Sequence, residues 1–373
     1  MRIFLFFPVL FISHLVVFAQ EANQNDLQLN TITTALPFMA ITPDSRAGGM
    51  GEAGTALSPS ATSVYWNTAG ISFAEKNSEL SLSYTPWLRQ LTNDMHLSYL
   101  SGYYRVNKKH AIGGALRYFS LGEIGIVQDE FSEELIEKPN ELTIDASYSL
   151  RLADQFSMAV GLRYLRSDLR IQAVDANASA ASSIAVDISG YYQSEENAYD
   201  SFNGRWRAGF AIQNLGPTIK YDDAGRENFL PTNLRLGGGF DFIFDDYNKI
   251  AVTAEIAKLL VPTPPIYGFV DTDGDGNQDS DESTIIVEGQ DPDVSFLSGM
   301  FQSFGDAPDG FSEELKEFTW ALSAEYLYQD SFAFRAGYFN ESEEARKWIE
   351  GLKVFLVANK FKGDIKKMTL YST

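Results

Sequence analysis

The feature that most constrains this chain is an alternation of apolar and polar residues that begins near residue 79 and recurs in segment after segment. In residues 142–150 every second residue is apolar, and the residues between them are Thr, Asp or Ser. Because side chains alternate between the two faces of a β-strand, such segments predict strands with one apolar face. The expected strands lie near residues 94–106, 110–120, 140–152, 155–165, 182–193, 205–214, 232–244, 248–259, 318–328 and 331–339.

The connections between these segments alternate in length. The tight turns are residues 107–109, 152–155, 245–248 and 329–331, and the long links are residues 121–140, 166–181, 215–231 and 260–317. Only the link at residues 194–204 is longer than this order requires. Outer-membrane barrels combine short periplasmic turns with long extracellular loops. We therefore expect an all-β fold, a transmembrane antiparallel β-barrel; a soluble β-sandwich with an aromatic core is the alternative.

Composition excludes several classes of protein. The chain contains no Cys, so disulfides, thiolate metal sites and Cys nucleophiles are excluded. Its net charge of -21 makes nucleic acid an unsuitable partner. Residues 1–19 combine Arg2, a mostly apolar run and a small-residue cleavage site, which predicts a secretory signal peptide. No later run is apolar for about 18 residues, so only a closed barrel could span a membrane.

The segment before the first strand is rich in small residues. Gly, Ala and Ser are concentrated in residues 43–73, and small residues let a backbone pack in a confined space. We therefore expect residues 20–76 to form a plug inside a barrel built from residues 77–373, with Trp66 and Asn67 among its packed residues. Gly49, Gly51 and Gly54 match the GxGxxG pattern of dinucleotide sites. No strand and helix alternate around them, so tight packing explains these glycines better.

Charges on the polar strand faces change sign from one strand to the next. Five successive strands should direct these charges inward: Arg117, Asp145, Arg163, Asp187 and Arg207. The same alternation turns five more inward: Arg235, Asp241, Glu255, Glu325 and Arg335. Neighbouring strands lie about 4.8 Å apart, so opposite charges at the same depth can pair. This pattern predicts a lumen crossed by ion pairs; charges that face lumen water without pairing are the alternative.

Residues 271–282 (DTDGDGNQDSDE) match the twelve-residue Ca²⁺ loop. Gly276 takes the position of the sharp turn, and the residues at the ligand positions are Asp271, Asp273, Asp275, Asn277, Asp279 and Glu282. The flanking residues have an extended pattern, so no EF-hand helices are expected. The motif predicts Ca²⁺ binding that stiffens an exposed loop, and a solvated acidic loop tip is the alternative. No other cofactor is expected.

Two long links contain the same sequence, FSEEL, at residues 131–135 and 311–315. Ser at a helix start and Glu in its first turn favour short helices here. An apolar and aromatic stretch, residues 300–310, precedes the second copy. We expect Phe131, Phe301, Phe304 and Phe311 to form a binding surface for a partner or cargo protein. In the alternative, Phe301, Phe304 and Phe311 fold inward and close the barrel mouth. This alternative is equally compatible with the sequence.

Catalytic motifs are absent from the sequence. Beyond residue 19 only two His residues occur, His96 and His110, and neither HExxH nor GxSxG is present. We therefore expect no enzymatic activity.

Four segments resemble the PorV family of type IX secretion proteins, which are relatives of the FadL-type transporters. They are residues 43–73, 262–267, 301–318 and 332–341, and the resemblance runs from about residue 41 to residue 348. It implies a FadL-like barrel of about fourteen strands in the outer membrane of a Gram-negative bacterium. It also implies that the protein receives cargo with C-terminal secretion signals from an SprA-type translocon. Delivery to a PorU-type attachment complex at the cell surface would follow, with outer-membrane lipid around the barrel.

The end of the chain departs from this family pattern. Residues 350–373 alternate poorly, contain Lys where lipid-facing residues are expected, and offer no closing strand. About twelve or thirteen strands are therefore expected in this sequence. Bacterial single-chain barrels have an even number of strands, and an unpaired edge in lipid is costly, so the sequence does not establish that the barrel closes. Two other functions fit the same sequence: a FadL-type channel for hydrophobic small molecules and a soluble surface adhesin.

Overall fold

One large antiparallel sheet dominates the structure, a computed structural model that describes residues 32–89, 92–127, 134–170, 179–221, 227–269, 283–329 and 331–341 and the backbone of residues 351–358. The sheet has thirteen strands, and every pairing in it is antiparallel. Its neighbours in order are β1 (Ser78–Pro86), β2 (Met95–Arg105), β3 (His110–Leu121), β6 (Asn140–Ala153), β7 (Phe156–Asp168), β8 (Ala181–Gln193), β10 (Asn203–Leu215), β11 (Asn233–Ile243), β12 (Asn248–Leu259), β15 (Phe318–Tyr328), β16 (Phe332–Asn340) and β17 (Gly351–Ala358), and β9 (Asn197–Ala198) pairs with β10. We refer to this sheet as the wall.

The two faces of the wall are the reverse of those of a water-soluble sheet. On β7, Val160 and Leu162 are 56% and 55% exposed, whereas Arg163 is 2% exposed. The same contrast holds on β15, where Trp320 and Leu322 are exposed while Ser323 and Glu325 are buried. A wall that is apolar outside and polar inside is typical of outer-membrane barrels. The structure therefore confirms the predicted fold class and excludes a sandwich with an aromatic core.

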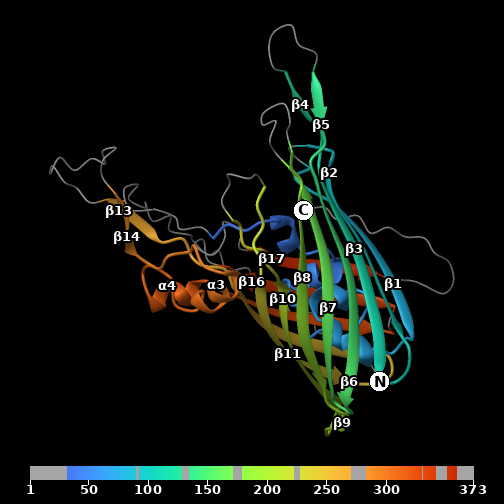
Figure 1. Cartoon of the computed structure of the whole chain (residues 1–373). Helices are drawn as coiled ribbons and strands as arrows, with labels where there is room; N and C mark the ends of the chain where they lie inside the picture. Colours follow the sequence, from blue (N-terminus) through green and yellow to red (C-terminus); the bar gives the residue numbers. More distant parts are fainter. Residues whose placement is uncertain are drawn as a thin grey trace, which may run out of the picture.

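The N-terminal helices lie against the inner, polar face of the wall (Figure 1). They are η1 (Pro37–Ala40), α1 (Ser45–Gly49), α2 (Ser63–Trp66) and η2 (Thr68–Phe73). The last of these contacts β3, β6, β7 and β8 as well as β2. Buried plug residues include Trp66, Phe38, Met50 and Ile71. The described part of the plug, residues 32–76, thus shares a core with the strands.

The long links carry the remaining elements. The hairpin of β4 (Ile124–Ile126) and β5 (Leu135–Glu137) extends one loop, and that of β13 (Ile266–Phe269) and β14 (Thr284–Glu288) extends another. The helices α3 (Phe296–Gln302) and α4 (Phe311–Lys316) follow β14 and lie together to one side of the wall (Figure 1). The helix expected over residues 311–315 is therefore present, although Gly310 and not Ser precedes its first turn. The helix expected over residues 131–135 does not include Leu135, which belongs to β5.

The wall has two edges in the described residues. The strands β1 and β17 each pair with one neighbour, so the sheet is not closed. It has thirteen strands, whereas the family resemblance implied fourteen.

At the end with the tight turns, the long link at residues 194–204 includes β9, and Tyr199 and Phe202 stack there with ring centroids 4.9 Å apart. In the described part of the chain, no helix has the length and hydropathy needed to cross a membrane.

Candidate functional site

The plug is held together by one buried carboxylate. Asp44 precedes α1 and accepts a hydrogen bond from the Ala47 amide at 3.0 Å, which satisfies one of the free N–H groups at the helix start. Its other oxygen accepts a 2.6 Å hydrogen bond from the indole Nε1 of Trp66 on α2. Asp44 therefore joins two helices that are separated by the Gly-rich stretch.

Three side chains bind the plug to different strands of the wall. The amide of Asn67 donates 2.9 Å hydrogen bonds to the carbonyls of Thr55 and Gly190, so it links the plug to β8. Glu255 on β12 accepts from the backbone N–H groups of Gly54 and Thr55 at 2.8 and 2.7 Å. Arg46 forms a 2.8 Å ion pair with Glu325 on β15. The plug is thus fixed by charged and polar contacts around its circumference.

Close packing accounts for the plug glycines. A Cβ atom on Gly54 would lie 2.0 Å from the Trp66 ring, and Gly51 has a φ of +62°, which favours glycine. Gly49 is buried at the end of α1. The wall supplies a matching glycine that the sequence did not reveal: a Cβ on Gly337 would lie 2.1 Å from the Gly51 nitrogen. No strand–helix unit surrounds these glycines, so the structure offers no dinucleotide site there.

Buried ion pairs join adjacent strands of the wall. Arg163 on β7 pairs with Asp145 on β6 and, at 3.0 Å, with Asp187 on β8. Arg207 on β10 pairs with Asp241 on β11 at 2.7 Å. The remaining two pairs of this kind among the described residues are Arg235 with Glu255 at 3.0 Å and Arg335 with Glu325. Asp145 lies directly opposite Arg163 in the strand register, whereas Asp187 lies diagonally from it.

Arg117 differs from the pattern that the sign alternation predicted. The strand register places it opposite Thr143, so no carboxylate lies directly across from it on β6. In the described structure it has no salt bridge and instead donates a 3.1 Å hydrogen bond to the Met39 carbonyl of the plug. Its guanidinium lies 4.5 Å from the centroid of the Tyr65 ring, a cation–π contact. Arg117 therefore contacts the plug and, at 5.7 Å, the Tyr99 ring on β2, and it forms no ion pair with β6 among the described residues.

The helices α3 and α4 and the turn after α3 present aromatic side chains to the surroundings. Phe301 is 71% exposed, Phe311 is 77% exposed and Phe304 is 46% exposed. Leu297 and Leu315 on the same two helices are also about half exposed. We call these five residues the loop-helix surface. They do not fold inward into the barrel mouth.

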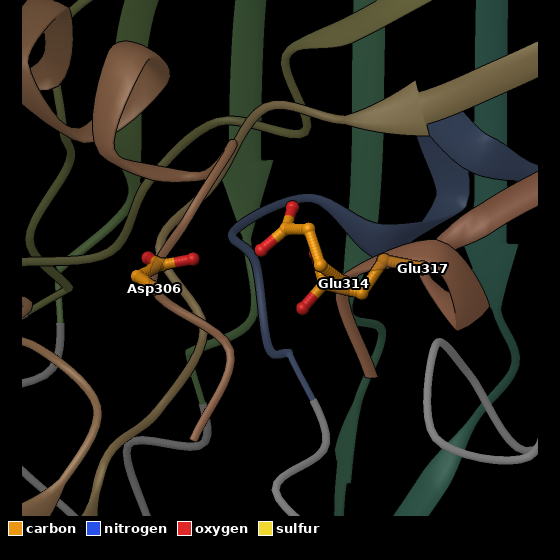
Figure 2. A group of neighbouring side chains, drawn as sticks. All are labelled: Asp306, Glu314 and Glu317. Atoms are coloured by element: carbon orange, nitrogen blue, oxygen red, sulfur yellow. The ribbon is translucent and has the colours of Figure 1, made fainter. Parts of the chain in front are cut away.

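A buried charge cluster lies beneath the loop-helix surface. Lys258, at the end of β12, is 2.7 Å from Glu314 and 2.5 Å from Glu317. Glu317 also accepts from the Thr263 hydroxyl at 2.6 Å, and Asp306 accepts from the Thr263 N–H at 2.9 Å. Asp306 comes from the loop between the helices, and the two glutamates come from α4 and its end (Figure 2). Burial, reinforced by the charges of Glu317 and Glu314, raises the pKa of Asp306 to about 6.

Some predicted site residues lie outside the described residues. These are the signal peptide, Phe131 and the whole Ca²⁺ motif of residues 271–282. Neither Arg46 nor the cluster around Lys258 is predicted by the sequence pattern. The only sequence signals for them are an Arg inside a segment of small residues and a Lys at the end of a strand, and neither is specific.

The sequence model of the type IX secretion system protein PorV matches residues 22–266, about two thirds of the chain. This chain belongs to the PorV family. PorV proteins are components of the type IX secretion system in the outer membrane of Gram-negative bacteria, which agrees with the apolar outer face of the wall. A comparison with curated proteins gave no match.

Solved structures of outer-membrane transporters are also similar. The toluene transporter TodX of Pseudomonas putida is 11% identical with a TM-score of 0.38, and the match covers 79% of this PorV chain and 82% of TodX. A FadL homologue of Pseudomonas aeruginosa is 12% identical with a TM-score of 0.38, and the match covers 80% of both chains. Likeness at this level carries no argument about the ligand or the function.

Proposed function

We propose that this PorV protein is a non-enzymatic carrier at the outer membrane. In this proposal it receives secreted proteins with C-terminal secretion signals from an SprA-type translocon and delivers them to a PorU-type attachment complex. Membership of the PorV family supports a role in type IX secretion. The transfer of cargo, and the translocon and attachment complex between which it occurs, are what we propose.

The observation that carries the proposal is the loop-helix surface. Five apolar side chains on α3, on α4 and just after α3 are 46–77% exposed, although the charge cluster beneath them is buried. Exposed apolar patches that include aromatic residues are typical of protein-binding sites. Because the buried ion pairs of Lys258 hold α4 against β12, the surface is presented in a fixed orientation.

The filled lumen favours transfer at the surface over passage through the barrel. Arg46, Asn67 and the backbone of Gly54 and Thr55 all bind wall residues. Opening a path would require these buried polar contacts to break together, and each unsatisfied group would cost about 1–3 kcal/mol. For this reason we prefer the carrier over a channel for hydrophobic small molecules.

The test is affinity isolation of the full chain from outer membranes, followed by mass spectrometry of the proteins and lipids recovered with it. The variant Phe301→Ser with Phe311→Ser removes the two most exposed rings of the loop-helix surface. The matched control, Tyr267→Ser with Val287→Ser, removes exposed apolar side chains from the β13–β14 hairpin. We expect the wild type and the control to recover a large translocon barrel and cargo with C-terminal signal domains, and the Phe variant to lose cargo.

Two outcomes would contradict the proposal. If the Phe variant recovers as much cargo as the control, the loop-helix surface does not bind it. If the wild type recovers only lipids or fatty acids, with one held in the lumen, the channel function is the better conclusion.

A further inference from the structure

We propose that Asp306, Glu314 and Glu317 bind a divalent metal cation. In the extracellular medium, the ion bound at this site would be Ca²⁺. All three side chains are buried, and one carboxylate oxygen from each lies within 4.8 Å of the others. Figure 2 shows that the carboxylates converge from two separate segments, the loop that follows α3 and the helix α4. A cation here would join these segments beneath the loop-helix surface.

The hydrogen bonding of the cluster is incomplete in a way that points to a ligand. Asp306 is 1% exposed, and its Oδ1 has no hydrogen-bond partner among the described residues. The Oε2 of Glu314 is likewise buried without a partner. A buried charged oxygen with no partner is costly, and native structures rarely leave one unexplained. Two such oxygens in one cluster provide ready ligand positions.

The charge balance supports a divalent cation. The three carboxylates contribute three negative charges, and Lys258 contributes one positive charge, so the cluster carries a net charge of -2. Lys258 lies within ion-pair distance of the two glutamates, and no such pair joins it to Asp306 in the described part of the chain. Its ammonium group is therefore placed beside the two glutamates, and among the described residues no ion pair compensates the charge of Asp306. One divalent ion would neutralise the whole group.

The ligand atoms specify the kind of cation. Carboxylate oxygens suit hard cations, and Ca²⁺ accepts six to eight oxygen ligands in flexible geometry, so water or backbone carbonyls would complete the shell. The nearby ammonium group weakens binding. We expect a dissociation constant on the order of 10⁻⁴–10⁻³ M, the range of extracellular calcium modules.

The experiment must separate this site from the Ca²⁺ motif of residues 271–282. The background protein therefore carries Asp273→Asn, Asp275→Asn and Glu282→Gln, and it is the full chain, purified in detergent and freed of metal with a chelator. Equilibrium dialysis with ⁴⁵Ca²⁺ should give about one ion per chain at millimolar Ca²⁺, the stoichiometry of a single carboxylate site. Added Ca²⁺ should also raise the melting temperature.

Two variants of this background decide the assignment. Asp306→Asn with Glu314→Gln removes the two ligands that have free oxygens, and we expect it to lose the bound ion and the thermal shift. Asp291→Asn with Asp293→Asn removes the same charge from exposed positions of the same long link, and we expect it to bind like the background. Should the double ligand variant not fold, the isosteric Asp306→Asn alone replaces it. A background that binds no Ca²⁺ at 10 mM, or a ligand variant that binds as much as the control, would overturn the proposal.

Discussion

The substitution Arg163→Met tests whether the buried ion pairs stabilise the wall. Arg163 is 2% exposed and bridges carboxylates on both neighbouring strands. Removing it leaves two nearby carboxylates, the 8% exposed Asp145 and the 17% exposed Asp187, without their common partner. Breaking a buried pair in this way costs about 3–5 kcal/mol.

The structure narrows this range. Asp187 is 17% exposed and keeps a 2.7 Å hydrogen bond from the Asn214 amide, so part of its charge stays compensated. The Asp145 side chain is 8% exposed and loses its ion pair entirely. We therefore expect a loss of about 3–4 kcal/mol, in the lower part of the range, which is two to three orders of magnitude in the unfolding equilibrium.

The assay is equilibrium unfolding by denaturant in detergent, followed by the heat-dependent gel shift that separates folded from unfolded barrels. Arg166→Met is the matched control, because Arg166 lies on the same strand with a 44% exposed side chain and pairs with Asp168 at 3.3 Å. Exposed pairs contribute about 0–1 kcal/mol. In a third protein, Asp145→Asn and Asp187→Asn are added to Arg163→Met, which removes the uncompensated charge and should restore most of the stability.

Two results would refute this reasoning. Equal stability of the Arg163 and Arg166 variants would mean that the buried pairs contribute no more than surface pairs. A triple variant as unstable as Arg163→Met would assign the loss to packing and not to charge.

Three further substitutions test the plug and the outer face. Gly337→Ala should loosen the plug, because its Cβ would lie 2.1 Å from the Met50 backbone, and limited proteolysis should cut the N-terminal segment faster than in Gly238→Ala, where no atom lies within 4 Å; equal cleavage rates would contradict this. Trp66→Phe should cost about 1–3 kcal/mol by leaving a buried carboxylate oxygen without its donor, and an unchanged denaturation midpoint would argue against that hydrogen bond. Val160→Arg should cost about 2–4 kcal/mol near the bilayer midplane, whereas an unaffected folded fraction in lipid vesicles would mean that this face of β7 is not in lipid.

The strands could be predicted because the period-two alternation in the sequence follows directly from the geometry of a β-strand. The expected segment at residues 155–165 corresponds to β7, Phe156–Asp168, and the difference at its end is a few residues. The tight turn before it also fixes the register, which is why Asp145 and Arg163 face each other. The α3 helix was not predicted, because Phe296–Gln302 has no regular polar face and forms within a loop.

The packing of the plug could not be predicted in the same detail. Composition showed that residues 43–73 must pack tightly, but the need for Gly337 arises only where the chain near Met50 approaches β16. Likewise, nothing near Lys258 in the sequence indicates that Asp306 and Glu314 will lie in the same charge cluster, since they are about fifty residues away. Contacts of this kind depend on the path of a long loop, and a period-two pattern says nothing about that path.

Arg117 shows that the inward charges hold the plug as well as the wall. Asp145 lies opposite Arg163, and the two strands hold each other. Arg117 is opposite Thr143, so its charge has no partner across the strand pair and turns to the Met39 carbonyl and the Tyr65 ring. Opposition in the register is not required for a pair within the wall, because Arg207 and Arg235 pair with carboxylates that lie diagonally across the strand pair. Glu255 and Glu325 each pair with a wall arginine and also hold the plug. The inward charges therefore stabilise the sheet and hold the plug through the same alternation of side chains.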